Sequence, residues 1–277
     1  MRGNKSVKIY RIIIAVVIIG FLIAGVKIFA DKISENKQLD EPEINTKEIQ
    51  KIDILLSKQS FKPEPVKAAL GKYDGNAVLT TPKFQVAPAG YFEDALFIGD
   101  SRTVGIKEYG NIEGADFFAT EGMSVYSIYQ QRVSISGVGE VSLKTLLKSK
   151  DYGKIYIMLG INELGYKLSD NAEAYRNLVD TIRGYQPNAI IYIQANLHVA
   201  SSRSKTDKTF NNNRIDNYNN LLAGIADNRD IFYIDVNELF DDANGGLGEE
   251  YTSDDIHIMG KYYGDWGAWI AERVIVR

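Results

Sequence analysis

The residues that could do chemistry in this chain lie in short segments that follow apolar runs. Gly99-Asp100-Ser101 comes directly after the apolar run Ala95–Ile98, and Asn162 follows a second such run. Further along, Asp254 precedes His257 by three residues. A serine hydroxyl is a weak nucleophile that needs a base, and a histidine held by a carboxylate can serve as that base. The residue types therefore indicate acyl transfer, with Ser101 as nucleophile, His257 as base and Asp254 as the group that orients His257.

Acyl transfer also needs hydrogen-bond donors for the negative oxygen of the tetrahedral intermediate. The backbone N–H of Ser101 is one candidate if a helix starts there, because the helix N-terminus carries positive partial charge. Gly122 lets the backbone approach closely and present a second N–H. The side-chain amide of Asn162 is the third candidate. These three residues form the predicted oxyanion hole.

Each of these segments has a plainer interpretation when it is taken alone. A serine after a strand often only caps a helix, and Gly-Asp-Ser could form an anion-binding turn for a phosphate. Asp254 and His257 could be a pair on the surface. We favour the catalytic interpretation because all the segments occur together, each after a predicted strand or in the last loop.

The segments are positioned by an alternating pattern of strands and helices from Tyr91 onward. The predicted strands are Ala95–Gly99, Ala115–Thr120, Lys154–Leu159, Ala189–Gln194 and Ile231–Val236. Helical spacing of apolar residues predicts helices over Asn171–Tyr185, 208–227 and about 260–275, and Trp266 and Trp269 of the last helix are expected to pack in the core. Alternating strands and helices predict an α/β domain with a central parallel sheet. Chemistry in such sheets gathers at the carboxyl ends of the strands, where the candidate residues lie.

The first thirty residues differ from the rest of the chain. Residues 12–26 are uninterrupted apolar sequence, which with the flanking residues reaches the roughly 20 that a membrane-spanning helix needs. Basic residues precede this stretch, so the positive-inside rule predicts a cytoplasmic N-terminus and an extracellular remainder. A cleaved signal peptide is the alternative, although Lys27, Ile28 and Phe29 make a poor cleavage site. We predict an anchor over residues 1–30, an extracellular stalk over 31–90 and a catalytic domain over 91–277.

Composition excludes several classes of function. The net charge of −4 gives no basic face for nucleic acid, and without cysteine the chain has no disulfide, thiolate metal site or cysteine nucleophile. Its two histidines, His198 and His257, and scattered carboxylates show no metal-ligand spacing. We therefore predict no metal site.

The four segments resemble the conserved blocks of the SGNH (GDSL-type) hydrolases. Gly99-Asp100-Ser101 matches the first block, Gly122 the glycine block, Gly160-Ile161-Asn162-Glu163 the third, and Asp254-Asp255-Ile256-His257 the last. The blocks occur in the family's order and cover about 95–277. The resemblance implies a flavodoxin-like three-layer α/β/α sandwich and ester hydrolysis or acyl transfer without a cofactor.

The chain departs from the family's pattern at two positions. Arg102 stands where the family has leucine, and it could approach the site and bind an anionic substrate or point into solvent. Glu163 stands where aspartate is usual, and we expect Glu163 and Asp255 to be solvated or to cap loops. His198 is expected to be structural or to contact the substrate.

The resemblance and the predicted anchor together suggest a membrane-anchored extracellular serine esterase. The expected substrates are acyl esters, and in particular acetyl esters, on cell-surface glycans such as peptidoglycan, or another small ester. One alternative is an O-acetyltransferase acting on cell-wall polysaccharide, which would need a multi-span acyl-donor protein in the membrane. The other is a catalytically silent binding module with the same fold.

Overall fold

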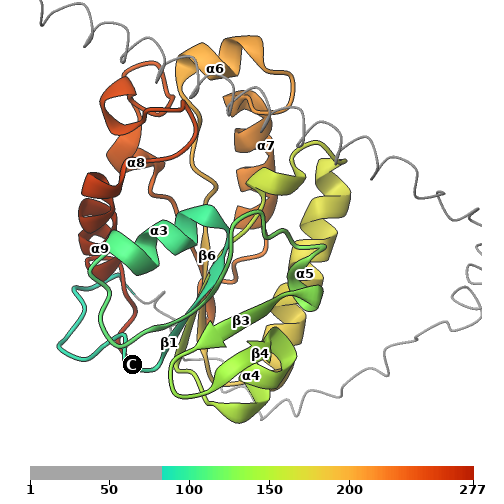
Figure 1. Cartoon of the computed structure of the whole chain (residues 1–277), viewed down its shortest axis with the longest axis vertical. Coiled ribbons are helices and arrows are strands. Elements are labelled where there is room, and N and C mark those ends of the chain that lie inside the picture. Colours follow the sequence, from blue (N-terminus) through green and yellow to red (C-terminus); the bar gives the residue numbers. More distant parts are fainter. Residues whose placement is uncertain (1–82) are drawn as a thin grey trace, which may run out of the picture. The chain divides into compact units, whose positions relative to one another are not determined.

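The computed structural model describes residues 83–277 of the chain (Figure 1). The predicted transmembrane segment at residues 12–26 and the predicted stalk up to residue 82 lie outside the described residues. Over residues 83–277, no helix is long and apolar enough to cross a membrane.

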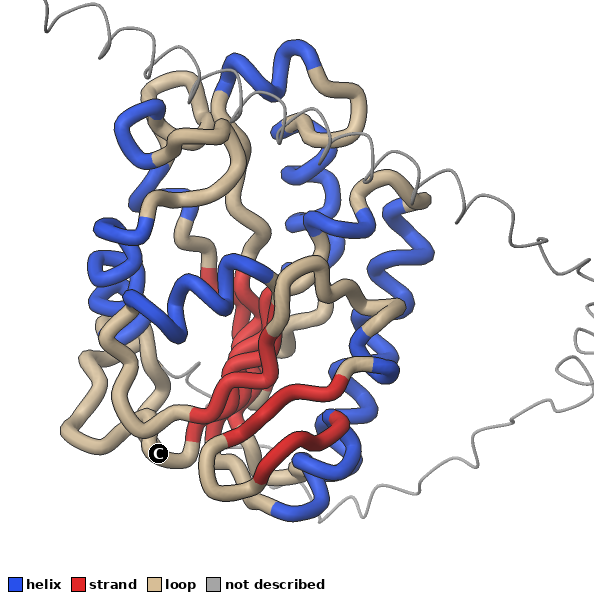
Figure 2. Tube along the Cα trace, in the orientation of Figure 1, coloured by secondary structure: helices blue, strands red, loops and turns tan. Residues whose placement is uncertain are grey.

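A five-stranded parallel sheet forms the centre of the described domain, as predicted (Figure 2). In spatial order its strands are β2 (Asp116–Ala119), β1 (Ala95–Gly99), β5 (Lys154–Met158), β6 (Ile190–Gln194) and β7 (Ile231–Ile234). Strands β1 and β6 are buried along their whole length. Burial on both faces explains why these strands read as continuous apolar runs.

Helices cover both faces of the sheet, so the domain has three layers (Figure 1). One face carries α3 (Ser101–Tyr109), α8 (Asn237–Phe240) and α9 (Tyr263–Ala271), and the other carries α4 (Leu143–Ser149), α5 (Leu168–Tyr185) and α7 (Asn212–Ala223). Shorter elements are α6 (Ser201–Thr206) and the 3-10 turns η2 (Ile128–Gln130), η3 (Ile161–Glu163), η4 (Glu249–Tyr251) and η5 (Gly260–Tyr262). The predicted helices over 171–185, 208–227 and 260–275 correspond to α5, α7 and the pair η5 and α9.

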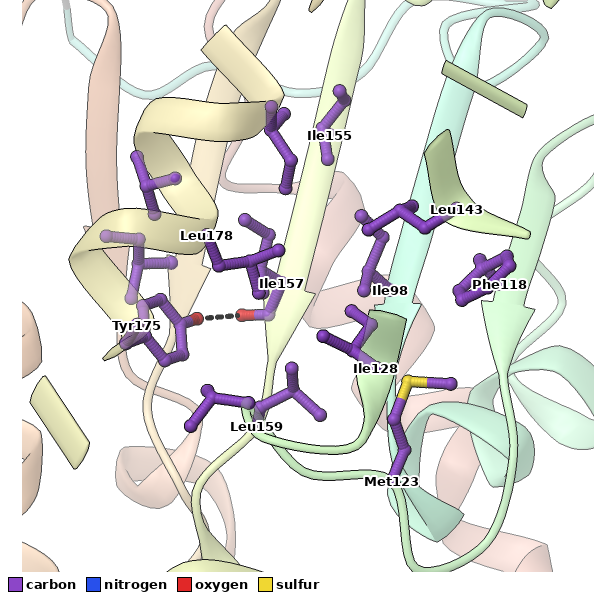
Figure 3. Close-up of a cluster of buried hydrophobic side chains, with 14 of the residues drawn as sticks. Ile98, Phe118, Met123, Ile128, Leu143, Ile155, Ile157, Leu159, Tyr175 and Leu178 are labelled. Carbon is purple, nitrogen blue, oxygen red and sulfur yellow. Dashed lines mark hydrogen bonds between the residues drawn. The ribbon is translucent and has the colours of Figure 1, made fainter. Parts of the chain in front are cut away.

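The core on the α5 side is built from aliphatic side chains of the strands and the inner face of that helix. Figure 3 shows Ile155 and Ile157 of β5 facing Leu178 and Tyr175 of α5. The hydroxyl of the fully buried Tyr175 donates a hydrogen bond to the carbonyl of Ile157 at 2.9 Å. This bond satisfies a polar group that would otherwise be costly to bury.

The core on the α9 side contains a stack of aromatic rings that runs across three strands. Phe97, Tyr156 and Tyr192 occupy paired positions on β1, β5 and β6, and their ring centroids lie 4.4 and 4.3 Å apart. Trp266 and Trp269 of α9 are buried, which confirms their predicted core role.

A two-stranded antiparallel hairpin was not predicted from the sequence. It consists of β3 (Arg132–Ile135) and β4 (Gly139–Ser142), and β3 alternates exposed and buried residues. Gly137 and Gly139 in its turn have positive φ angles of 74° and 91°. The alternation and the glycine turn are hairpin signals that the sequence does carry.

The segment before the first strand also packs on the domain. Gln85 forms an isolated antiparallel bridge with Val274, and its N–H donates to the Val274 carbonyl at 2.8 Å. The Tyr91 carbonyl accepts a hydrogen bond from Nζ of Lys154, the first residue of β5. Residues 85 and 274 are therefore neighbours near the amino ends of the strands.

Candidate active site

Ser101 is the first residue of α3 and follows directly from the end of β1. Asp100 caps this helix, because its Oδ1 accepts the N–H of Arg102 at 3.0 Å. The strand-to-helix turn is tight, and a Cβ at Gly99 would lie 2.0 Å from Oγ1 of Thr103. The turn thus places the Ser101 hydroxyl at the carboxyl edge of the sheet and at the positive end of a helix.

The structure brings Ser101, His257 and Asp254 together in one hydrogen-bonded chain. Oγ of Ser101 lies 3.0 Å from Nε2 of His257, and Nδ1 of His257 lies 2.7 Å from Oδ2 of Asp254. These are the contacts that a serine nucleophile, a base and an orienting carboxylate require.

A tight turn holds Asp254 against His257. Oδ1 of Asp254 accepts the backbone N–H groups of Ile256 at 3.0 Å and His257 at 2.7 Å, and Asp255, which follows Asp254, has a φ of 68°. Burial on its own raises the pKa of Asp254, but the hydrogen bonds from His257 and Ile256 outweigh it and lower the pKa to about 2. Asp254 is therefore a carboxylate at neutral pH, the form that orients an imidazole.

The three oxyanion candidates meet in one cleft of about 510 Å³, which Ser101, Gly122, Asn162 and His257 line together. Gly122 has a φ of 71°, a conformation that favours glycine, and a Cβ there would meet no atom within 4 Å. One N–H of the Asn162 amide is engaged, since Nδ2 donates to the Met123 carbonyl at 2.8 Å. This bond fixes the Asn162 side chain next to the loop that carries Gly122.

Glu163 is not solvated, so that part of the expectation is wrong, whereas the alternative that it caps a loop agrees with its bond to the backbone of the 122–125 loop. Its side chain is fully buried, and its Oε1 accepts the backbone N–H of Val125 at 3.1 Å. Burial raises the pKa of Glu163 to about 7, with a smaller contribution in the same direction from Asp100. The adjacent side chains of Asn162 and Glu163 thus both bind the 122–125 loop, at the Met123 carbonyl and the Val125 N–H.

Arg102 does not contact substrate or point into solvent, which corrects both predictions for it. Its side chain is fully buried, and its guanidinium nitrogens have no hydrogen-bond partner among the described residues. Burial raises the pKa of the neighbouring Asp100, and the charge of Arg102 opposes that effect. The helical position after Ser101 therefore faces the interior of the domain, which the sequence alone did not reveal.

His198 lies outside the cleft, so its predicted contact with substrate is wrong and its structural alternative holds. Its Nδ1 lies 2.8 Å from Oδ2 of Asp241, and its Nε2 lies 2.8 Å from Oδ1 of Asp216. Burial on its own lowers the pKa of His198, but the bonds to the two carboxylates outweigh it and the pKa is raised. Through Asp216 and Asp241 the imidazole connects the segment after β6 to α7 and to the loop after α8.

Sequence reasoning missed the side chains that wall the cleft. Glu108 and Tyr109 from the end of α3, Glu121 beside Gly122, and Tyr263 of α9 all line it. These residues carry no motif, and it is the packing of α3 against α9 that brings Glu108, Tyr109 and Tyr263 to the site. In residues 83–277, no group of three or more histidine, aspartate or glutamate side chains is arranged to hold a metal ion.

Comparisons with known proteins agree with this geometry. Residues 97–263 match the model of the GDSL-like Lipase/Acylhydrolase family. No curated protein matches the chain.

Solved structures of similar fold come from several bacteria. One, a candidate platelet activating factor from Streptococcus pneumonia, has a TM-score of 0.53 and 18% identity, over 64% of this chain and 81% of that one. A GDSL-like lipase from Bacteroides thetaiotaomicron has a TM-score of 0.50 and 15% identity, over 66% and 88%. A candidate acylhydrolase from Bacteroides fragilis has a TM-score of 0.50 and 14% identity, over 66% and 87%. At such identities the likeness shows a shared fold.

Proposed function

Because the chain belongs to the GDSL-like lipase/acylhydrolase family, a family of carboxylic ester hydrolases, we propose that it is a serine esterase acting on acetyl esters of cell-surface glycans such as peptidoglycan. The observation that carries this proposal is the hydrogen-bonded chain from Ser101 through His257 to Asp254, open to a cleft at the carboxyl edge of the sheet. The proposed roles are nucleophile for Ser101, general base and acid for His257, and orienting carboxylate for Asp254.

The first half of the proposed reaction forms an acyl-enzyme. The Ser101 Oγ forms a bond to the ester carbonyl carbon while Nε2 of His257 takes the hydroxyl proton. The carbonyl oxygen becomes an oxyanion, for which the N–H groups of Ser101 and Gly122 and the Asn162 amide are the proposed donors. The bond from carbon to the alcohol oxygen then breaks, and His257 gives its proton to the departing alcohol.

The second half replaces the alcohol with water. Nε2 of His257 takes a proton from water as the water oxygen attacks the acyl carbon, and the proton returns to Ser101 Oγ as the acid leaves. The side chains of His257 and Asp254 are 45% and 52% exposed, so water reaches the base directly. This exposure supports hydrolysis rather than transfer to a sugar, which would need water to be excluded.

The lining of the cleft supports an uncharged substrate. It includes the carboxylates of Glu108 and Glu121, and among the described residues that line it none is lysine or arginine. An anionic ester such as a phospholipid would therefore be repelled. A neutral acetylated sugar fits this charge pattern.

We also propose that residues 1–30 anchor the protein in the cell membrane with the catalytic domain outside. The support is the apolar run at residues 12–26 and the basic residues before it. Protease treatment of intact cells is then expected to release the domain. A domain that stays intact inside protease-treated cells would refute this topology.

The catalytic proposal is tested with the full-length protein purified in detergent. Hydrolysis of p-nitrophenyl acetate is measured for the wild type, Ser101→Ala and His257→Ala, with the exposed Ser202→Ala in α6 as the matched control. We expect both site variants to lose activity by about 10⁴-fold or more, and the control to keep it. Equal activity in Ser101→Ala and the control would refute the assignment of the nucleophile.

A further inference from the structure

A second hollow of about 500 Å³ adjoins the catalytic cleft. It is lined by Gly122, Ser124, Tyr126, Asn162 and Tyr166. Gly122 and Asn162 also line the catalytic cleft, so the two hollows meet at the proposed oxyanion donors. We refer to these five residues as the tyrosine hollow.

Two exposed aromatic rings form one wall of the tyrosine hollow. Tyr126 is 44% exposed and Tyr166 is 64% exposed. Their ring centroids lie 5.6 Å apart and the ring planes meet at 72°, so the rings form an L-shaped surface. The catalytic proposal assigns no role to this pair.

Hydrogen bonds hold the side chain of Tyr126 and the backbone of Tyr166. The Tyr126 hydroxyl donates to Oδ1 of Asn171 at 2.9 Å, and Nδ2 of this buried Asn171 donates to the Glu163 carbonyl at 2.7 Å. The backbone N–H of Tyr166 donates to the same Glu163 carbonyl at 2.9 Å, and the Tyr166 carbonyl accepts from Arg214. A ligand that binds the Tyr126 ring therefore loses little entropy in ordering it.

The chemistry of the lining distinguishes between ligands. Among the described residues that line the tyrosine hollow there is no aliphatic side chain and no charged one. A fatty acyl chain calls for aliphatic walls, and an anionic headgroup calls for a cation. A sugar ring presents C–H groups on its faces and hydroxyls around its edge, which match aromatic faces bordered by hydroxyl and amide groups.

We propose that the tyrosine hollow binds a neutral sugar unit adjacent to the unit that carries the reacting ester. The departing oxygen must reach Nε2 of His257, and neither His257 nor Ser101 lines the hollow. The reacting sugar therefore occupies the catalytic cleft, and an acetyl group is too small to fill a hollow of about 500 Å³. The next sugar along the chain takes that place, which makes the enzyme selective for oligosaccharide esters. The inference rests on the proposed function for the position of the ester.

The test compares O-acetylated chitotetraose with p-nitrophenyl acetate, using full-length protein in detergent. The variant is Tyr166→Ala, and the matched control is Tyr129→Ala, since Tyr129 is 47% exposed in η2 and lines neither hollow. We expect Tyr166→Ala to lower the ratio of kcat/KM for the tetrasaccharide to kcat/KM for p-nitrophenyl acetate by about tenfold, mainly through KM, which corresponds to the loss of one aromatic contact of about 1.4 kcal/mol. Tyr129→Ala should leave the ratio unchanged.

Two results would overturn the inference. One is an unchanged ratio in Tyr166→Ala, and the other is a selective loss on p-nitrophenyl octanoate, which would make the hollow an acyl site. Binding of unreacted chitotetraose to Ser101→Ala by calorimetry, with and without Tyr166→Ala, tests sugar binding separately from catalysis. If neither the wild type nor any variant hydrolyses p-nitrophenyl acetate, the proposed function is refuted. The calorimetry would still show whether the tyrosine hollow binds a sugar.

Discussion

Replacing Glu163 with glutamine is expected to change how the stability of the domain depends on pH. Glu163 is fully buried beneath the 122–125 loop, and its pKa is about 7 in the folded protein against 4.5 for the free side chain. The folded state therefore keeps a proton that the unfolded state releases as pH rises. Stability from this group is complete below pH 4.5 and is lost as pH rises toward 7.

The size of the effect follows from the two pKa values. Each pH unit between 4.5 and about 7 removes up to 1.36 kcal/mol from the free energy of unfolding, or about 3 kcal/mol in total. Glutamine resembles the protonated acid and can still accept the Val125 N–H, yet it does not titrate. The variant should therefore gain about 3 kcal/mol relative to the wild type between pH 4.5 and pH 7.5.

Urea denaturation at several pH values measures this difference. The two tryptophans of the chain, Trp266 and Trp269, are both buried in α9 and report unfolding by fluorescence. Subtracting the wild-type curve from that of Glu163→Gln cancels the other titrating groups. Parallel curves for the two proteins across this pH range would refute the assignment of a shifted proton to Glu163.

Three further predictions concern stability and rate. His198→Gln should lower the free energy of unfolding by about 2 kcal/mol at pH 6 and by less at pH 9. The reason is that a raised histidine pKa gives stability below pH 6.5 that is lost as pH rises through the folded pKa. Urea denaturation at both pH values checks this, and a larger loss at pH 9 would contradict it. Gly105→Ala should destabilise the domain by about 1–3 kcal/mol, because its Cβ would lie 2.2 Å from the Tyr263 ring. Gly184→Ala, in an open part of α5, should instead stabilise the domain by about 0.5–1 kcal/mol, and thermal unfolding measures both effects. Asp254→Asn should lower kcat by about 10³–10⁴-fold with little change in melting temperature, and an unchanged kcat for p-nitrophenyl acetate would show that His257 needs no carboxylate.

Local sequence signals were sufficient for the sheet and for the residues at its edge. Each predicted strand is a short apolar run, and burial on both faces is what such runs require. The candidates Ser101, Asn162 and Asp254 follow strands or sit in the last loop, so the parallel topology alone brings them to one edge. Their geometry could be anticipated without knowing any tertiary contact, although their catalytic roles stay predictions.

Features that depend on tertiary packing could not be predicted in this way. Arg102 was expected to bind substrate or to point into solvent, and His198 to be structural or to contact substrate, and the sequence did not show that both are buried. Glu163 was expected to be solvated or to cap a loop, and its burial depends on the 122–125 loop folding over it. Tyr126 and Tyr166 are in contact only because two loops far apart in the sequence converge. No spacing of residues along the sequence indicates this contact.

The bridge between Gln85 and Val274 has a consequence for how the domain can be attached to anything else. Both residues lie near the amino ends of the strands, while Ser101 and His257 lie at the carboxyl ends, and the C-terminus is marked at the lower end of the sheet in Figure 1. A bead, a surface or a second protein joined directly at residue 83 or residue 277 would meet the side of the described domain opposite the cleft. Because residues 85 and 274 are neighbours, a short peptide could also join the two ends of the domain over residues 83–277, and this domain could be reopened in a distant loop. The parallel direction of the strands thus places the attachment points of the described domain at the opposite side from its catalytic cleft.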